Sequence, residues 1–184
     1  MAYTSVLLSG LPGCGKLTLS KMLSTELGWE LFSVGDLWRA QWKKLHPDGK
    51  PSFENYWKNT SFDENREMDM KAKARFEQGN VVADSRYSIH CKDIPALRVF
   101  VDADLETRAL RASNTGKYSG KSLNEIQKIL LEREDDEVMM GRILFEDYDK
   151  NYDYRDSKHY AFQLNSGFLS SEEMTALIKS MLSN

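Results

Sequence analysis

The chain has 184 residues, with 41% hydrophobic and 29% charged side chains and a formal net charge of -3. This composition predicts one soluble globular domain with a sizeable core. The slight negative charge argues against general binding to nucleic acids or membrane surfaces, and no apolar segment approaches the ~18 residues of a membrane span.

Short apolar runs alternate with helical patterns along the chain, which predicts a parallel sheet with crossover helices. Strands are expected at 4–9, 30–33, 80–83, 97–101 and 160–164. Helices are expected at 15–27, 35–45, 52–57, 63–78 and 105–112, from 122 to at least 140, and from 170 onward. The last two begin with capping boxes, formed by Ser122 with Glu125 and by Ser170 with Glu173. The final helix has an apolar stripe of Met174, Leu177, Ile178, Met181 and Leu182.

The first strand leads into GLPGCGKLT, a Gly-x4-Gly-Lys pattern that opens the first helix. Such a loop lets consecutive backbone N–H groups converge on a phosphate at the positive end of a helix, and its lysine reaches the outer phosphates. We therefore predict an ATP-binding loop, formed by Gly10, Leu11, Pro12, Gly13, Cys14, Gly15, Lys16, Leu17 and Thr18.

Leu17 is unusual because a Ser or Thr hydroxyl that ligates Mg2+ normally follows the lysine. Thr18 is expected to contact a phosphate, but its side chain points in a different direction on the helix from that of residue 17. Two hypotheses stay open: the nucleotide and water hold most of the metal, which Mg2+ tolerates, or catalysis is weakened.

Four further segments carry a family resemblance: 31–39 (LFSVGDLWR), 79–87 (GNVVADSRY), 99–111 (VFVDADLETRALR) and 125–134 (EIQKILLERE). Together they resemble the short, cytidylate kinase-like branch of P-loop nucleoside monophosphate kinases. The resemblance implies a single α/β domain over 1–184 with a three-layer P-loop NTPase fold and a parallel five-stranded sheet. It implies a core at about 1–45, 79–113 and 123–184, a helical monophosphate-binding insertion at about 46–78, and a small lid at about 114–122.

The same resemblance implies that ATP donates its γ-phosphate to a nucleoside monophosphate, with CMP or dCMP favoured, and that Mg2+ assists. The implied catalytic residues are Lys16, Arg108 and Arg133, and Arg108 and Arg111 are expected to serve ATP. The implied acceptor-binding residues are Ser33, Arg39, Asp84, Arg86, Arg133 and Glu137. Arginine suits these positions because its planar fork binds phosphate oxygens in pairs. A monomer is typical of such kinases.

For several of these residues, a structural role is the alternative to a role in binding. Asp84 is expected to hold the water shell of Mg2+, but a salt bridge to Lys16 or Arg86 is the alternative. Arg39 and Arg86 could form structural ion pairs, and Ser33 could cap a helix.

Three positions depart from the family pattern: Ser85, Tyr87 and Met140. Because they fall where the acceptor base would be read, a second hypothesis is a P-loop kinase for another small acceptor. A third, motivated by Leu17, is a nucleotide-binding module with little turnover. The only partners expected are ATP and the acceptor.

Three other features complete the predictions. The aromatic stretch 53–62 could stack on a base, but packing between helices is favoured. The run 132–137 (EREDDE) is expected to be a solvated helix face apart from Arg133 and Glu137. Cys14 and Cys91 have no metal-ligand spacing, and no signal peptide is evident, so we expect a cytoplasmic protein without disulfides.

Overall fold

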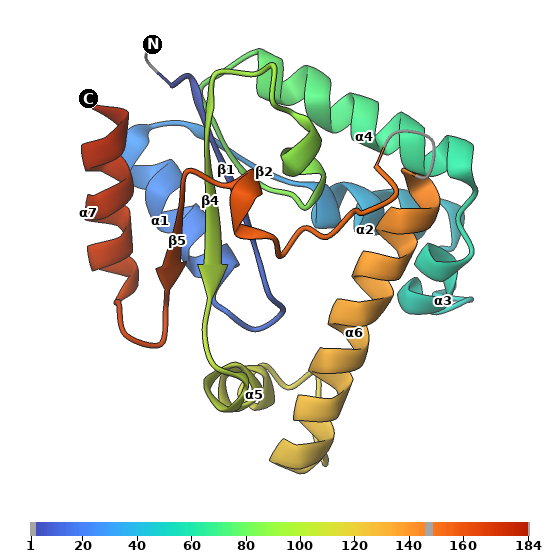
Figure 1. The fold of residues 1–184 in the computed structure, drawn as a ribbon. Helices are drawn as coiled ribbons and strands as arrows, with labels where there is room; N and C mark the ends of the chain where they lie inside the picture. Colours follow the sequence, from blue (N-terminus) through green and yellow to red (C-terminus); the bar gives the residue numbers. More distant parts are fainter. Residues whose placement is uncertain (1–2, 146–148, 184) are drawn as a thin grey trace.

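The computed structural model describes residues 3–145 and 149–183, in which helices cover both faces of a five-stranded parallel sheet (Figure 1). The strands, β1 (Ser5–Gly10), β2 (Glu30–Ser33), β3 (Val81–Asp84), β4 (Ala96–Asp102) and β5 (Phe162–Asn165), are ordered β2-β3-β1-β4-β5. The register pairs Asp84 of β3 with Leu8 of β1 and with Ser33 of β2. The carboxyl ends of these strands therefore lie side by side, and the predicted fold class is confirmed.

The helices are α1 (Lys16–Leu27), α2 (Val34–Leu45), α3 (Phe53–Lys58), α4 (Phe62–Glu77), α5 (Leu105–Ser113), α6 (Leu123–Leu144) and α7 (Ser171–Leu182). Helix and strand boundaries fall within two residues of those predicted, and both predicted capping boxes are present. Two short 3-10 helices, η1 (Tyr87–His90) and η2 (Ser157–His159), were not predicted, because such single turns leave no periodic pattern. Among the described residues, every helix is too short or too polar to span a lipid bilayer.

The central strand β1 is buried along its whole length and contributes to two cores. Successive side chains of a strand point to opposite faces of the sheet. Leu8 packs with Leu23 of α1 and Ile178 of α7, whereas Leu7 packs with Phe76 of α4 on the other face. Burial on both faces anchors the strand that leads into the glycine-rich loop.

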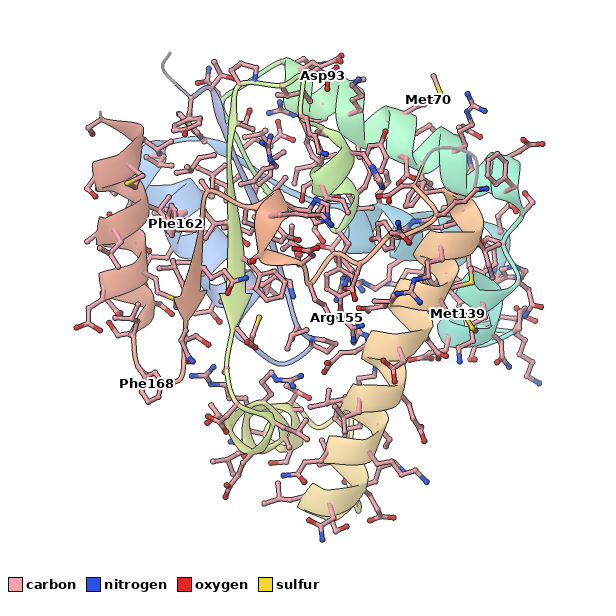
Figure 2. All side chains as sticks on the ribbon, in the orientation of Figure 1. Met70, Asp93, Met139, Arg155, Phe162 and Phe168 are labelled. Carbon is pink, nitrogen blue, oxygen red and sulfur yellow. The ribbon has the colours of Figure 1, made fainter. Side chains whose placement is uncertain are left out.

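Only part of the stripe predicted for α7 is buried. Met174 and Ile178 are buried, but Leu177 and Met181 are 44% and 40% exposed. These two side chains border a small hollow beside Phe162, which lies on the edge strand β5 (Figure 2). The sheet ends at β5, so it is too narrow to cover the whole stripe.

Helices α3 and α4 pack beside the end of α6 (Figure 1) and form a small core of their own with α2. Tyr56 of α3 is buried there, with its ring 6.2 Å from that of Trp38 in an edge-to-face arrangement, and Met68 of α4 completes the cluster. The prediction that the aromatic stretch serves packing is confirmed for Tyr56.

Two ion pairs tie α3 to other parts of the chain. Lys58 lies 2.6 Å from Asp136 of α6, and Glu54 lies 3.1 Å from Lys117 in the glycine-containing segment 114–122. The segment predicted as the lid therefore touches the segment predicted as the acceptor-binding insertion.

Candidate active site

The glycine-rich loop joins the end of β1 to the start of α1. Gly10 has φ +148°, and a side chain there would place a Cβ 2.0 Å from the carbonyl oxygen of Val101 in β4. Gly15 has φ +87° and is the residue that caps α1. These positions need glycine, because L side chains rarely adopt such a backbone or have such space. The loop thus places its amides at the positive end of α1, where a phosphate is stabilised.

Lys16, in the first turn of α1, folds back over this loop. Its ammonium group is buried and donates to the carbonyl oxygens of Gly10 at 2.8 Å and Leu11 at 3.3 Å. The charge of Lys16 also acts on the carboxylate of Glu137 in α6. The structure therefore connects the loop lysine to a charged cluster on the other side of the site.

Arg108 of α5 contacts the backbone of the glycine-rich loop. Its guanidinium donates to the carbonyl oxygens of Ala103 at 2.9 Å and Pro12 at 3.2 Å, and it forms a buried ion pair with Glu134 of α6. Glu134 is only 5% exposed, so the prediction that the 132–137 run is solvated apart from Arg133 and Glu137 was wrong at this position. No sequence pattern indicates this pairing, because Arg108 lies on a different helix.

Arg111, one turn later on α5, also contacts the loop. It donates to the carbonyl oxygen of Cys14 at 3.4 Å, to the hydroxyl of Ser166 at 2.8 Å and to its carbonyl oxygen at 2.7 Å. The Ser166 hydroxyl in turn donates to the carbonyl oxygen of Cys14 at 2.7 Å. Arg108 and Arg111 thus both donate hydrogen bonds to main-chain carbonyls of the glycine-rich loop.

Glu137 of α6 lies between two of the predicted acceptor arginines. Its Oε2 is 2.6 Å from Nε of Arg86, which follows β3, and its Oε1 accepts from Nε of Arg133 at 2.9 Å. The side chain of Glu137 is 7% exposed, whereas those of Arg86 and Arg133 are 24% and 47% exposed. Two cations therefore share one buried carboxylate, and each keeps part of its surface open.

Burial opposes ionisation of Glu137, but the charges of Arg86, Arg133 and Lys16 outweigh it and hold the pKa of this carboxyl below its usual value. At neutral pH the cluster therefore holds one negative and two positive charges. A second anion could share the arginines without leaving a buried carboxylate unpaired.

Tyr154 is a member of this cluster that the sequence did not suggest. It comes from the connection between α6 and η2, is fully buried, and donates its hydroxyl to Oε2 of Glu137 at 3.0 Å. It stands in the segment 147–156, which contains three tyrosines and four aspartates with no helical or strand period, so only the folded chain distinguishes it.

The other predicted acceptor residues lie at the carboxyl ends of β2 and β3. The Ser33 hydroxyl accepts from the amide of Asp36 at 3.2 Å, which is the helix-capping alternative. Arg39 pairs with Asp36 at 2.6 Å and is half exposed, with Phe53 of α3 beneath its guanidinium. Its described contacts do not include Arg86 or Arg133. Asp84 ends β3, and its charge acts on Arg86.

The oxygen ligands for a metal are few. Leu17 is 49% exposed and offers none, and the described residues contain no group of three or more His, Cys, Asp or Glu side chains that could hold an ion. Mg2+ usually keeps several waters and binds through one or two carboxylates plus substrate phosphates. The single carboxylate of Asp84 fits an ion carried by the nucleotide, but not a metal cage built by the protein alone.

Comparison with known proteins places the chain in a family. Residues 6–153 match the family described as AAA domain. The chain is 27% identical to a cytidylate kinase of Ignicoccus hospitalis over 97% of its own length and 99% of that protein. It is 30% identical to one of Pyrobaculum aerophilum, over 71% and 68% of the two chains.

The fold also has solved counterparts. A shikimate kinase from Bacteroides thetaiotaomicron superposes with a TM-score of 0.60 at 16% identity, covering 98% of this chain and 99% of that one. At this identity the likeness concerns the fold alone. The family match and the sequence relatives mean that the chain belongs to the AAA domain family and to the cytidylate kinase-like group of P-loop proteins.

Proposed function

We propose that the protein transfers the γ-phosphoryl group of ATP to the phosphate of a nucleoside monophosphate, with CMP or dCMP favoured. The observation that carries this proposal is the pair of arginines, Arg86 and Arg133, that share Glu137 beside the loop lysine. Such a site has cationic surface for two polyanions placed end to end, which is what phosphoryl transfer requires. The names of the sequence relatives favour cytidine as the base.

In the proposed reaction, an oxygen of the acceptor phosphate forms a bond to the γ-phosphorus. The bond from that phosphorus to the β–γ bridging oxygen breaks, and its electron pair leaves with ADP. The loop amides and Lys16 bind the donor phosphates, while Arg86 and Arg39 fix the attacking phosphate. Arg133 stabilises the moving group from the α6 side. Arg108 and Arg111 act by shaping the loop, in keeping with their contacts to its carbonyls.

Asp84 would hold Mg2+ through its water shell, together with the phosphates of ATP. The ion would supply neutralisation of phosphate charge when bound. Leu17 leaves this role without the usual hydroxyl, so the proposal treats the metal as part of the nucleotide substrate.

The segments 46–78 and 114–122 are proposed as the acceptor-binding insertion and the lid of a single domain over 1–184. Their contact through Glu54 and Lys117 supports this assignment, since both segments would enclose the transferred group. Enclosure excludes water and so prevents wasteful hydrolysis of ATP. The activity requires ATP and one small acceptor as partners. We assign it to a monomer in the cytoplasm, where the thiols of Cys14 and Cys91 stay reduced.

The direct test is coupled ADP release with CMP, dCMP, UMP, AMP and GMP as acceptors. Arg133→Gln should lower kcat/KM for the monophosphate about tenfold or more, because one charge-assisted contact to the moving phosphoryl group is lost. Its matched control is Lys128→Gln on the same helix, where the side chain is 80% exposed. Lys16→Met should abolish turnover and so shows that the activity belongs to this chain.

Turnover with shikimate or gluconate but with no monophosphate would overturn the nucleotide assignment and favour a P-loop kinase for another small acceptor. ATP binding without turnover on any acceptor would instead favour a nucleotide-binding module. Leu17 is the feature that motivates this last alternative, because its exposed side chain stands where a metal-binding hydroxyl is usual.

A further inference from the structure

The connection between α6 and η2 places Tyr154 within the acceptor cluster, which consists of Glu137, Arg86 and Arg133. Tyr154 is 0% exposed, and its hydroxyl lies 3.0 Å from Oε2 of Glu137. The guanidinium carbon of Arg86 lies over the same ring, 5.0 Å from its centre. One side chain thus contacts both the shared carboxylate and one of the two cations that the carboxylate binds.

The position of Tyr154 is fixed by its neighbours. The hydroxyl of Tyr160 donates to the carbonyl oxygen of Tyr154. The next residue, Arg155, pairs with Asp153 and reaches Asp135 of α6 at 3.3 Å (Figure 2). Two residues earlier, Tyr152 packs so closely on α6 that a Cβ at Gly141 would lie 2.0 Å from its ring. The ring therefore has little freedom to follow Glu137 if that carboxylate moves.

The two carboxylate oxygens of Glu137 have different partners. Oε1 accepts from Arg133, while Oε2 contacts both Arg86 and the hydroxyl of Tyr154. Burial raises the pKa of Tyr154, so the hydroxyl keeps its proton and acts as a donor. Without this donor, Arg86 alone would balance the charge of Oε2, and their ion pair, already at 2.6 Å, would become stronger. A phosphate would then have to compete with a tighter ion pair for the same cation.

We propose that Tyr154 is a positioning residue for the acceptor phosphate: through Glu137 and through its ring it holds Arg86 where a phosphate can share it. The inference rests on the proposed function of the arginine cluster and adds to it a residue with no direct contact to the transferred group. The glycine-rich loop is held separately, by Arg108 and Arg111, so we expect the donor side of the site to depend much less on Tyr154.

The test is Tyr154→Phe, which keeps the ring and removes only the hydroxyl. Its matched control is Tyr152→Phe, in the same buried aromatic cluster, where Arg142 donates to the backbone carbonyl of Tyr152, a contact that does not involve the hydroxyl. For Tyr154→Phe we expect the KM for CMP to rise about threefold to tenfold, with the upper limit set by one lost hydrogen bond to a charged group, while the KM for ATP stays within about twofold. Tyr152→Phe should leave both constants near wild type.

A pH profile gives a readout that a structural role alone would not change. Because Tyr154 donates to the ionised form of Glu137, its removal should shift the acidic limb of kcat/KM for CMP to higher pH. If Tyr154→Phe is not folded by circular dichroism, Tyr160→Phe is the second variant. It frees the carbonyl of Tyr154, and we expect the same selective rise in acceptor KM at smaller size.

Calorimetric binding of CMP to the wild-type protein separates this inference from the proposed function. If wild type does not bind CMP or any other monophosphate, the proposed function fails. If wild type binds CMP, and Tyr154→Phe matches it in affinity, in acceptor KM and in pH profile, the role given to Tyr154 is wrong. An equal rise in the KM values for ATP and CMP would also overturn it, since a positioning role is confined to the acceptor.

Discussion

Two buried carboxylates on one helix, Glu134 and Glu137, are used in opposite ways. Glu134 pairs with Arg108, and both side chains are almost completely buried, at 7% and 4% exposed. Glu137 is equally buried, but it is shared by Arg86 and Arg133, which are 24% and 47% exposed. The first pair is closed to solvent, whereas the second leaves cationic surface open.

The comparison separates a structural ion pair from a binding cluster. Arg108 donates to the carbonyls of Ala103 and Pro12 and pairs with Glu134, so its contacts connect α5 and α6 to the glycine-rich loop. Arg133 keeps about half of its side chain exposed after pairing with Glu137, and so can meet a ligand. Burial of the cation, more than burial of the carboxylate, distinguishes the two.

The largest expected effect is on the closed pair. Glu134→Gln keeps the side-chain volume but leaves the buried charge of Arg108 without its counterion, which should lower the free energy of unfolding by about 3 kcal/mol or more. Urea unfolding measures this. Glu132→Gln is the control on the same helix, because its pair with Lys128 is exposed and should contribute about 0.5 kcal/mol or less. Equal effects of the two changes would show that the buried pair of Arg108 and Glu134 stabilises the fold no more than an exposed pair does.

Glu137→Gln should cost less stability, about 2 kcal/mol at neutral pH, because water can hydrate the exposed parts of Arg86 and Arg133. It should also raise the acceptor KM, because losing the carboxylate that positions Arg86 and Arg133 outweighs removing an anion that competes for them. Glu134→Gln should not change the acceptor KM selectively. Because the pKa of Glu137 is lowered by folding, its contribution is complete above the unfolded value of 4.5 and is lost as pH falls below it.

The difference in unfolding free energy between wild type and Glu137→Gln should therefore be constant near neutral pH and should shrink in acid. Urea unfolding from pH 7 down to about pH 3.5 measures it. A difference that grows as the pH falls would mean that the carboxyl is destabilised by folding, contrary to the charges around it.

The smallest effect is expected at Leu17 on the donor side. Leu17→Thr replaces an exposed side chain, so it should change stability by about 0.5 kcal/mol or less. If the nucleotide and water hold most of the metal, kcat should change less than about fivefold at saturating Mg2+. A rise of a hundredfold would show instead that the wild-type donor site lacks a ligand it needs. Leu131→Thr, at a similarly exposed position on α6, is the control.

The fold was largely predictable because its signals are local. The order of elements follows from alternating apolar runs and helical patterns. The capping boxes at Ser122 and Ser170 mark helix starts, and each of these motifs is only four residues long. The single-turn helices η1 and η2 and the exposed half of the α7 stripe were not predictable in this way. Each depends on what the rest of the chain places nearby.

The candidate site likewise has one part with a local sequence pattern and another that depends on contacts between distant segments. The pattern from Gly10 to Lys16 identified the phosphate-binding loop from sequence alone, since its glycines and lysine act within one turn of a strand–helix connection. The pattern could not indicate that Glu134 is buried or that Tyr154 contacts Glu137. Those pairings join helices and connections distant in the chain.

By itself, then, the sequence determined where a phosphate-binding loop forms, because backbone preferences and capping act over a few residues. Only the tertiary structure decided which arginines are consumed by carboxylates or carbonyls, as Arg108 is, and which keep open surface, as Arg133 does. The physical reason is that the energy of a charge depends on its burial and its partners, and both are set by long-range packing.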